Sequence, residues 1–123
     1  SPFTREAFLY LADASEAAGN LADARLWLGR YDALAGEVAR PVRLRRLGGW
    51  SVALGDHRAA RGYLDPLLTA DTTDVPLLCW LAEARWHTGD AEGARALLAR
   101  AAAQAPRDPA VRRLRGVITS DQP

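Results

Sequence analysis

Apolar residues recur at helical spacing along almost the whole chain of 123 residues. Side chains three and four positions apart, such as Leu78, Leu81 and Ala82, share one face of a helix, whereas strands alternate with a period of two. Glycine and proline interrupt the pattern at regular intervals. The pattern therefore predicts an all-α fold with about seven helices. Their expected ranges are 4–18, 21–35, 41–54, 57–70, 75–88, 91–105 and 109–118.

Three of the predicted turns carry the same two-residue signal, in Gly19-Asn20, Gly55-Asp56 and Gly89-Asp90. The second and third signals lie 34 residues apart, and the first lies 36 residues before the second. Asn and Asp side chains accept hydrogen bonds from the free amides that open a helix. Each of these turns is therefore expected to end one helix and cap the next.

Small residues recur with the same offsets as the turns. They are Ala12, Gly48 and Ala82 in the first helix of each predicted pair, and Ala24, Ala60 and Ala94 in the second. A helix pair that repeats every ~34 residues with fixed small and large positions resembles the tetratricopeptide repeat. The resemblance implies a right-handed superhelix of antiparallel helix pairs. The implied units are residues 5–40, 41–74 and 75–108, followed by 109–118 as a capping helix or as the start of a further repeat.

The same resemblance implies a non-enzymatic module that binds a peptide or a partner helix in a concave groove. A structural spacer within a longer helical array is the alternative. In this family the first helix of each pair lines the groove, and Trp86 is expected to dominate binding unless it only packs against a neighbouring helix. The expected lining is Glu6, Leu9, Asp13, Glu16, Arg45, Gly49, Val52, Cys79, Glu83, Trp86 and His87. Its acidic N-terminal end predicts a basic group on the partner.

Charge narrows the range of partners. Sixteen basic residues, all arginine, accompany fifteen acidic residues, for a net charge of +1. Nucleic-acid binders and anionic-membrane binders need excess positive charge, so neither class of partner is expected. With 49% hydrophobic and 25% charged residues, the composition is ordinary for a globular domain, and membrane insertion is not expected either. The arginine clusters at 40–46 and 112–115 are interpreted as solvated helix faces. A chain rich in alanine and without lysine also suggests a bacterial, GC-rich genome.

Candidate chemistry is sparse, with two histidines, one cysteine and no phosphate-binding glycine motif. Cys79, Glu83 and His87 share a helix face, but the outer two lie ~12 Å apart along the helix axis, too far for one metal ion. No catalytic residue, metal, cofactor or internal disulfide is expected. The chain lacks methionine and runs from Ser1 to Asp121-Gln122-Pro123, which suggests a piece of a longer protein. Its compartment stays open, with the cytoplasm slightly favoured.

Overall fold

A computed structural model of the chain describes residues 2–119. Within this range seven α-helices and one short 3-10 helix are present and no strand occurs, which confirms the predicted all-α fold. The elements are α1 (Pro2–Ala17), α2 (Leu21–Leu34), α3 (Arg40–Ala53), α4 (His57–Leu64), η1 (Asp65–Leu67), α5 (Val75–His87), α6 (Ala91–Gln104) and α7 (Pro109–Val117). Ser1 and residues 121–123, from which a longer parent protein was inferred, lie outside the described residues.

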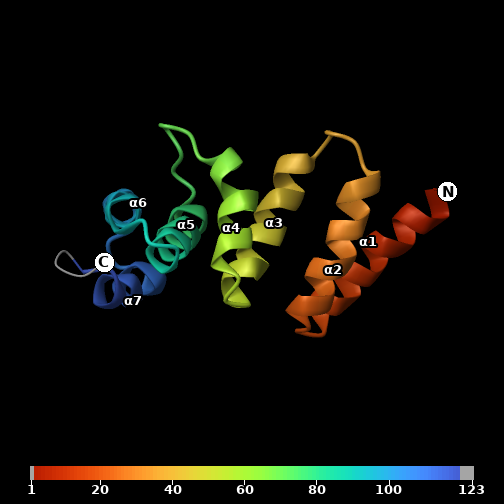
Figure 1. Cartoon of the computed structure of the whole chain (residues 1–123), viewed down its shortest axis with the longest axis horizontal. Coiled ribbons are helices and arrows are strands. Elements are labelled where there is room, and N and C mark those ends of the chain that lie inside the picture. Colours follow the sequence, from red (N-terminus) through yellow and green to blue (C-terminus); the bar gives the residue numbers. More distant parts are fainter. Residues whose placement is uncertain (1, 120–123) are drawn as a thin grey trace.

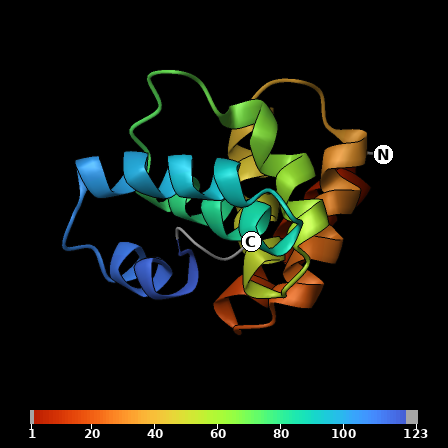
Figure 2. The ribbon, with the colours of Figure 1, turned by 60° about the vertical axis from the view of Figure 1, so that its left-hand side comes forward.

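The helices form a row of antiparallel pairs that runs from α1–α2 through α3–α4 to α5–α6 (Figure 1). Each helix packs against the next one in the chain, and α3 also contacts α5. At the C-terminal end α7 lies below α6 in Figure 2 and contacts both α5 and α6. Among the odd-numbered helices, α3 thus contacts α5 and α5 contacts α7, and this arrangement decides which side chains meet.

The three predicted turns have one common geometry. Gly19, Gly55 and Gly89 adopt φ angles of +78°, +78° and +91°, which side chains other than hydrogen rarely tolerate. The following residue in each case caps the next helix, as when the Asp90 carboxylate accepts the Gly93 amide at 2.9 Å. Asn20 and Asp56 cap α2 and α4 in the same way. The turn signals read from the sequence are confirmed.

The fourth helix is shorter than predicted. It was expected to run to residue 70, but α4 ends at Leu64 and η1 continues only to Leu67. Pro66 is the physical reason, because proline has no amide hydrogen and its ring collides with the carbonyl group of the preceding turn. Residues 68–74 consequently form an extended connection, here called the α4–α5 loop, which arches above the helices in Figure 1.

The buried apolar residues fall into two clusters of unequal size. The larger contains sixteen residues that extend from Val52 to Ile118, and the smaller contains Ala12, Ala24, Leu28, Leu47 and Trp50. Val111 and Leu114 of α7, with Ile118 directly after it, join the larger cluster, whereas Val117 is 38% exposed. Inside α3, Gly48 lies directly against the Leu64 side chain, so the small residue at this recurring position lets the two helices pack closely.

Candidate interaction surface

Charged and polar side chains join α1 to α3. The Arg46 guanidinium donates hydrogen bonds to the carboxylates of Asp13 at 2.8 Å and Glu16 at 3.0 Å. It also lies 4.9 Å from the centre of the Trp50 ring, and the indole N–H of Trp50 donates to Glu16 at 3.3 Å. Both acidic side chains that were expected to attract a basic partner are thus already paired with a cation of the chain itself.

Between α3 and α5, three side chains and one glycine form a layered contact, here called the Arg45–Trp80 stack. Arg45 donates two hydrogen bonds to the Asp74 carboxylate, at 2.8 and 3.0 Å, and lies 4.9 Å from the Trp80 ring centre. A Cβ atom at Gly49 would lie only 2.9 Å from the Trp80 ring. The indole therefore rests directly on the backbone of α3.

The hydrogen bonds of the Arg45–Trp80 stack keep both of its ionisable groups charged. Bonding to Arg45 is the main reason that the pKa of Asp74 lies below its ordinary value, and bonding to Asp74 raises the pKa of Arg45. Asp74 also accepts the amide of Leu77 and so caps the start of α5. One carboxylate thus fixes the position of Arg45 and the beginning of the helix that carries Trp80.

An ion pair and a histidine pair complete this side of the molecule. Arg113 of α7 donates to Glu83 of α5 at 2.8 Å. The exposed ring of His87 stacks on His57 of α4 with the ring centres 4.2 Å apart. Burial is the main cause that lowers the pKa of His57, and the charge on His87 adds to it. The His57 Nδ1 atom is buried without a hydrogen-bond partner among the described residues.

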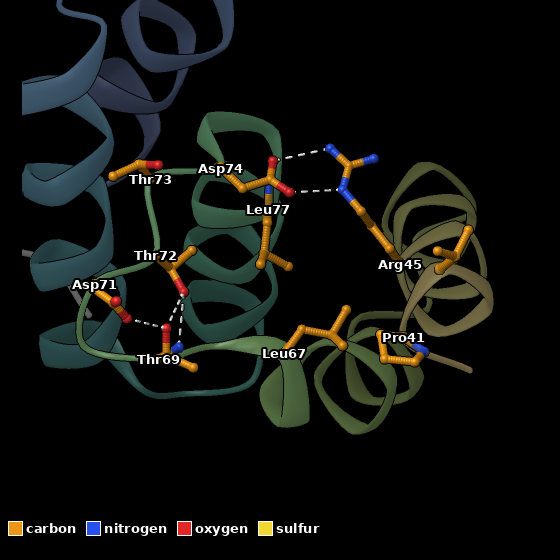
Figure 3. Close-up of a pocket in the computed structure, with 10 residues that line it drawn as sticks. Pro41, Arg45, Leu67, Thr69, Asp71, Thr72, Thr73, Asp74 and Leu77 are labelled. Carbon is orange, nitrogen blue, oxygen red and sulfur yellow. Dashed lines mark hydrogen bonds and ion pairs between the residues drawn. The ribbon is translucent and has the colours of Figure 1, made fainter. Parts of the chain in front are cut away.

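Except for His57 of α4, the side chains of these contacts belong to α1, α3 and α5, to Asp74 at the start of α5, and to α7; the set is here called the odd-helix face. Beside the Arg45–Asp74 pair, it opens into a cleft of about 520 Å³, here called the α3–α5 cleft (Figure 3). Pro41 and Val42 of α3, Leu67 of η1 and Leu77 of α5 supply its apolar walls, and the α4–α5 loop supplies polar ones. Figure 3 shows Arg45 reaching across from α3 to Asp74 at the edge of the cleft.

The residues predicted to line a groove are divided by the structure. Asp13, Glu16, Arg45, Gly49, Glu83 and His87 belong to the contacts of the odd-helix face, Glu6 is exposed on α1, and Leu9 is half-buried against the smaller cluster. Three of the predicted residues face elsewhere. Val52 and Cys79 are 8% and 3% exposed in the larger cluster. Trp86 is half-buried, and the Arg95 guanidinium of α6 lies 5.9 Å from its ring centre. This arrangement corresponds to the alternative in which Trp86 packs against a neighbouring helix.

Cys79 has the properties of a structural thiol. Its burial raises its pKa to about 11, so the thiol stays protonated at neutral pH and is a poor nucleophile. No group of three or more His, Cys, Asp or Glu side chains within residues 2–119 is placed to hold a metal ion. In the described part of the chain, no helix has the length and apolar character needed to cross a membrane.

Two residues of this face were missed by sequence reasoning. Trp80 was not placed in the groove, although it lies four residues after Pro76 and three before Glu83, a spacing that puts the three on one helix face. Arg46 was assigned to a solvated cluster. That interpretation was wrong for Arg43 as well, which is 6% exposed. It failed because the acidic partners come from neighbouring helices.

Arg43 illustrates this difference. Its guanidinium donates to the carboxylate of Asp32 at 2.7 Å and to the carbonyl oxygens of Gly36 and Val38 at 2.6 and 2.9 Å. The side chain thus holds the connection between α2 and α3, where Ala39 adopts a left-handed conformation with φ of 61°. A buried arginine with a hydrogen bond from each of its three guanidinium nitrogens stabilises this connection and is not available to a partner.

Comparison with known proteins identifies the family of the chain. A family model for the tetratricopeptide repeat matches residues 51–118, which is more than half of the chain. The chain belongs to the tetratricopeptide repeat family. Such repeats are generally non-catalytic modules for protein–protein interaction. Neither the curated proteins nor the solved structures gave a match.

Proposed function

We propose that the odd-helix face binds a peptide or a helix of a partner protein, with Trp80 as the principal contact. The Arg45–Trp80 stack is the observation that carries this proposal. Trp80 is partly exposed, lies between two helices and rests on a glycine, so its position is fixed before a partner arrives. Tryptophan and arginine at the centre of an interface often contribute most of the binding energy.

The charged side chains of this face are already paired within the chain, but they remain exposed enough to bond polar groups of a partner. Asp13 and Glu16 keep substantial exposure, at 59% and 48% of their side-chain areas, and Arg113 keeps 59%. Exposed pairs of this kind contribute under about 1 kcal/mol. They are therefore assigned to orientation of the partner, and the apolar contact at Trp80 is assigned to affinity.

A structural spacer is the second candidate function. It is favoured by an apolar cleft of about 480 Å³ between α6 and α7, which Leu98, Ala102 and Ile118 help to line. In stacked helical repeats each unit buries the open face of its neighbour. If the chain consists of repeats at residues 5–40, 41–74 and 75–108, α7 acts either as a cap or as the first helix of a further unit that packs into this cleft.

The test is capture of partners from a lysate of the native host by the parent chain and by matched variants. Trp80→Ala and Asp13→Arg change the odd-helix face, Trp86→Ala changes the tryptophan that packs against α6, and Arg58→Glu changes an exposed position on α4. We expect a partner to be retained by the last two variants and lost by the first two. Circular dichroism establishes that each variant is folded. Equal retention by folded Trp80→Ala and Asp13→Arg would refute the proposal.

A further inference from the structure

The α4–α5 loop forms a rigid wall of the α3–α5 cleft. One guanidinium, that of Arg100 on α6, donates to the carbonyl oxygens of Thr69 at 2.8 Å, Thr72 at 3.2 Å and Ala70 at 3.4 Å. Within the loop, the Thr69 amide donates to the Thr72 hydroxyl at 2.9 Å, and the Thr69 hydroxyl donates to Asp71 at 2.8 Å. The cleft is therefore shaped before any ligand enters, which reduces the entropic cost of binding.

The opposite wall of the cleft exposes apolar surface to water. Val42 is 62% exposed, and Pro41 beside it is exposed as well, although both lie at the ordered start of α3. Leu67 and Leu77 also line the cleft and lie between the loop and α3 in Figure 3. Removing apolar surface from water is favourable in proportion to the area covered. An apolar side chain is the occupant that gains most from this wall.

The charges around the cleft indicate which residue of the ligand would lie next to that apolar side chain. Arg45 and Asp74 neutralise each other through two hydrogen bonds, so the inner edge of the cleft carries no net charge. The remaining ionised group of the lining is the exposed carboxylate of Asp71 on the loop, which also interacts electrostatically with Arg100 of α6, a residue outside the lining. Among its own lining residues, the cleft thus combines a neutral interior with one carboxylate at the rim.

We propose that the α3–α5 cleft receives an apolar side chain of an extended peptide segment that carries a basic residue close to it, facing Asp71. An extended chain points successive side chains in opposite directions, so one enters the cleft while a neighbour reaches the rim. The volume of about 520 Å³ lies in the range of ordinary ligand sites. The proposal rests on the proposed function, because Arg45 belongs both to this cleft and to the Arg45–Trp80 stack.

A library of random peptides displayed on phage, selected on the parent chain, provides the probe. We expect enriched peptides to share an apolar residue with an arginine or lysine one or two positions away. The affinity of one enriched peptide is then measured by fluorescence polarisation. Val42→Glu places a carboxylate in the apolar wall and is expected to weaken binding about tenfold or more. Asp71→Lys reverses the exposed charge at the rim and is expected to weaken binding about threefold. Asp71→Asn, which keeps an oxygen to accept from the Thr69 hydroxyl, is the control for the shape of the loop.

The same selection separates this proposal from the proposed function. Peptides that lose affinity for Trp80→Ala and Asp13→Arg but keep it for Val42→Glu would overturn the cleft and leave the odd-helix face as the binding surface. Loss with Val42→Glu alone would support the cleft and refute the wider face. Repeating the selection on Asp71→Lys should replace the basic residue by an acidic one. Failure to enrich any peptide, or enrichment without an apolar residue, would overturn the cleft proposal.

Discussion

The first helix pair and the last three helices follow the same sequence pattern but are stabilised by different interactions. Around α5, α6 and α7 the larger cluster buries sixteen residues, mostly leucine, alanine and valine. The smaller cluster buries five, of which α1 supplies only Ala12. On α1, Phe3 and Tyr10 remain 87% and 72% exposed. Ion pairs and stacked aromatic rings, such as Phe8 on Trp27 at 5.8 Å, replace aliphatic packing there.

This difference shows that a repeat pattern does not guarantee equal stability for each repeat. In stacked helical repeats the total stability is approximately the sum of the units and their interfaces. The family match begins at residue 51, so it covers the region with aliphatic packing and excludes α1 and α2. We therefore expect α1–α2 to open at a lower free energy than α5–α7.

The largest effect is expected for removal of aliphatic volume from α5. Leu81 is fully buried, so Leu81→Ala should lower the free energy of unfolding by about 2–5 kcal/mol. The matched change Leu9→Ala, at a half-buried position on α1, should cost less than half as much. Urea unfolding followed by circular dichroism measures both. Equal losses would remove the distinction between the two regions.

Arg43 provides the second test, at the connection between α2 and α3. Arg43→Ala removes the 2.7 Å partner of the Asp32 carboxylate, which is 19% exposed, and leaves it only the longer contact with Arg40 at 4.0 Å. It also frees two carbonyl oxygens. We expect a loss of about 2–3 kcal/mol in the same unfolding assay, because hydrogen bonds to charged groups are the stronger kind. Arg43→Lys should recover only part of it, since one ammonium group cannot reproduce the planar fork. A stability unchanged in both variants would show that the connection holds without this arginine.

The histidine pair predicts a moderate dependence on pH at the junction of α4 and α5. The pKa of His57 lies below its ordinary value of 6.5, so the unfolded chain binds a proton there before the folded chain does. Stability should therefore fall as the pH drops below about 6.5, and the fall should end once the pH is below the pKa of His57 in the folded chain. Melting temperatures between pH 7.5 and 5.5 test this, and His57→Phe should flatten the profile in that window. Asp56 and Asp90 have pKa values lowered from 3.8 and titrate in a more acidic window.

The smallest effect is expected for the ion pairs of Arg46. Arg46→Ala should lower stability by under about 1 kcal/mol, because Asp13 and Glu16 are well exposed. Its local effect should be clearer, with faster hydrogen exchange in α1 and no change in α6. High salt applied to the parent chain should reproduce part of that acceleration. Exchange that rises equally in α1 and α6 would contradict a separate opening of the first pair.

The local features of this fold were predictable from the sequence, whereas partners across helices were not. The glycine and cap residues of the turns act on their immediate neighbours, so spacing alone located them. Arg46 and Asp13 lie 33 residues apart, and periodicity gives the side of a helix without naming the helix that faces it. The fourth helix was extended too far because Pro66 was given too little weight.

On α5, the predicted groove lining and the odd-helix face differ by an angle. One residue turns a helix by about 100°. The prediction names Cys79 where the odd-helix face has Trp80, so the two assignments on α5 differ by about one position. A rotation of this size changes the assignment of side chains at the edge of a face. Glu83 and His87 belong both to the predicted lining and to the odd-helix face.

The contact between Gly49 and Trp80 has an evolutionary consequence. Since a Cβ at position 49 would collide with the indole, the two positions form a size-complementary pair. Among descendants of this sequence, a larger residue at 49 is expected only where 80 has become smaller. The order of the two changes matters, because shrinking Trp80 first opens space that Gly49→Ala can then fill. The reverse order passes through an ancestor with a disturbed interface between its second and third helix pairs.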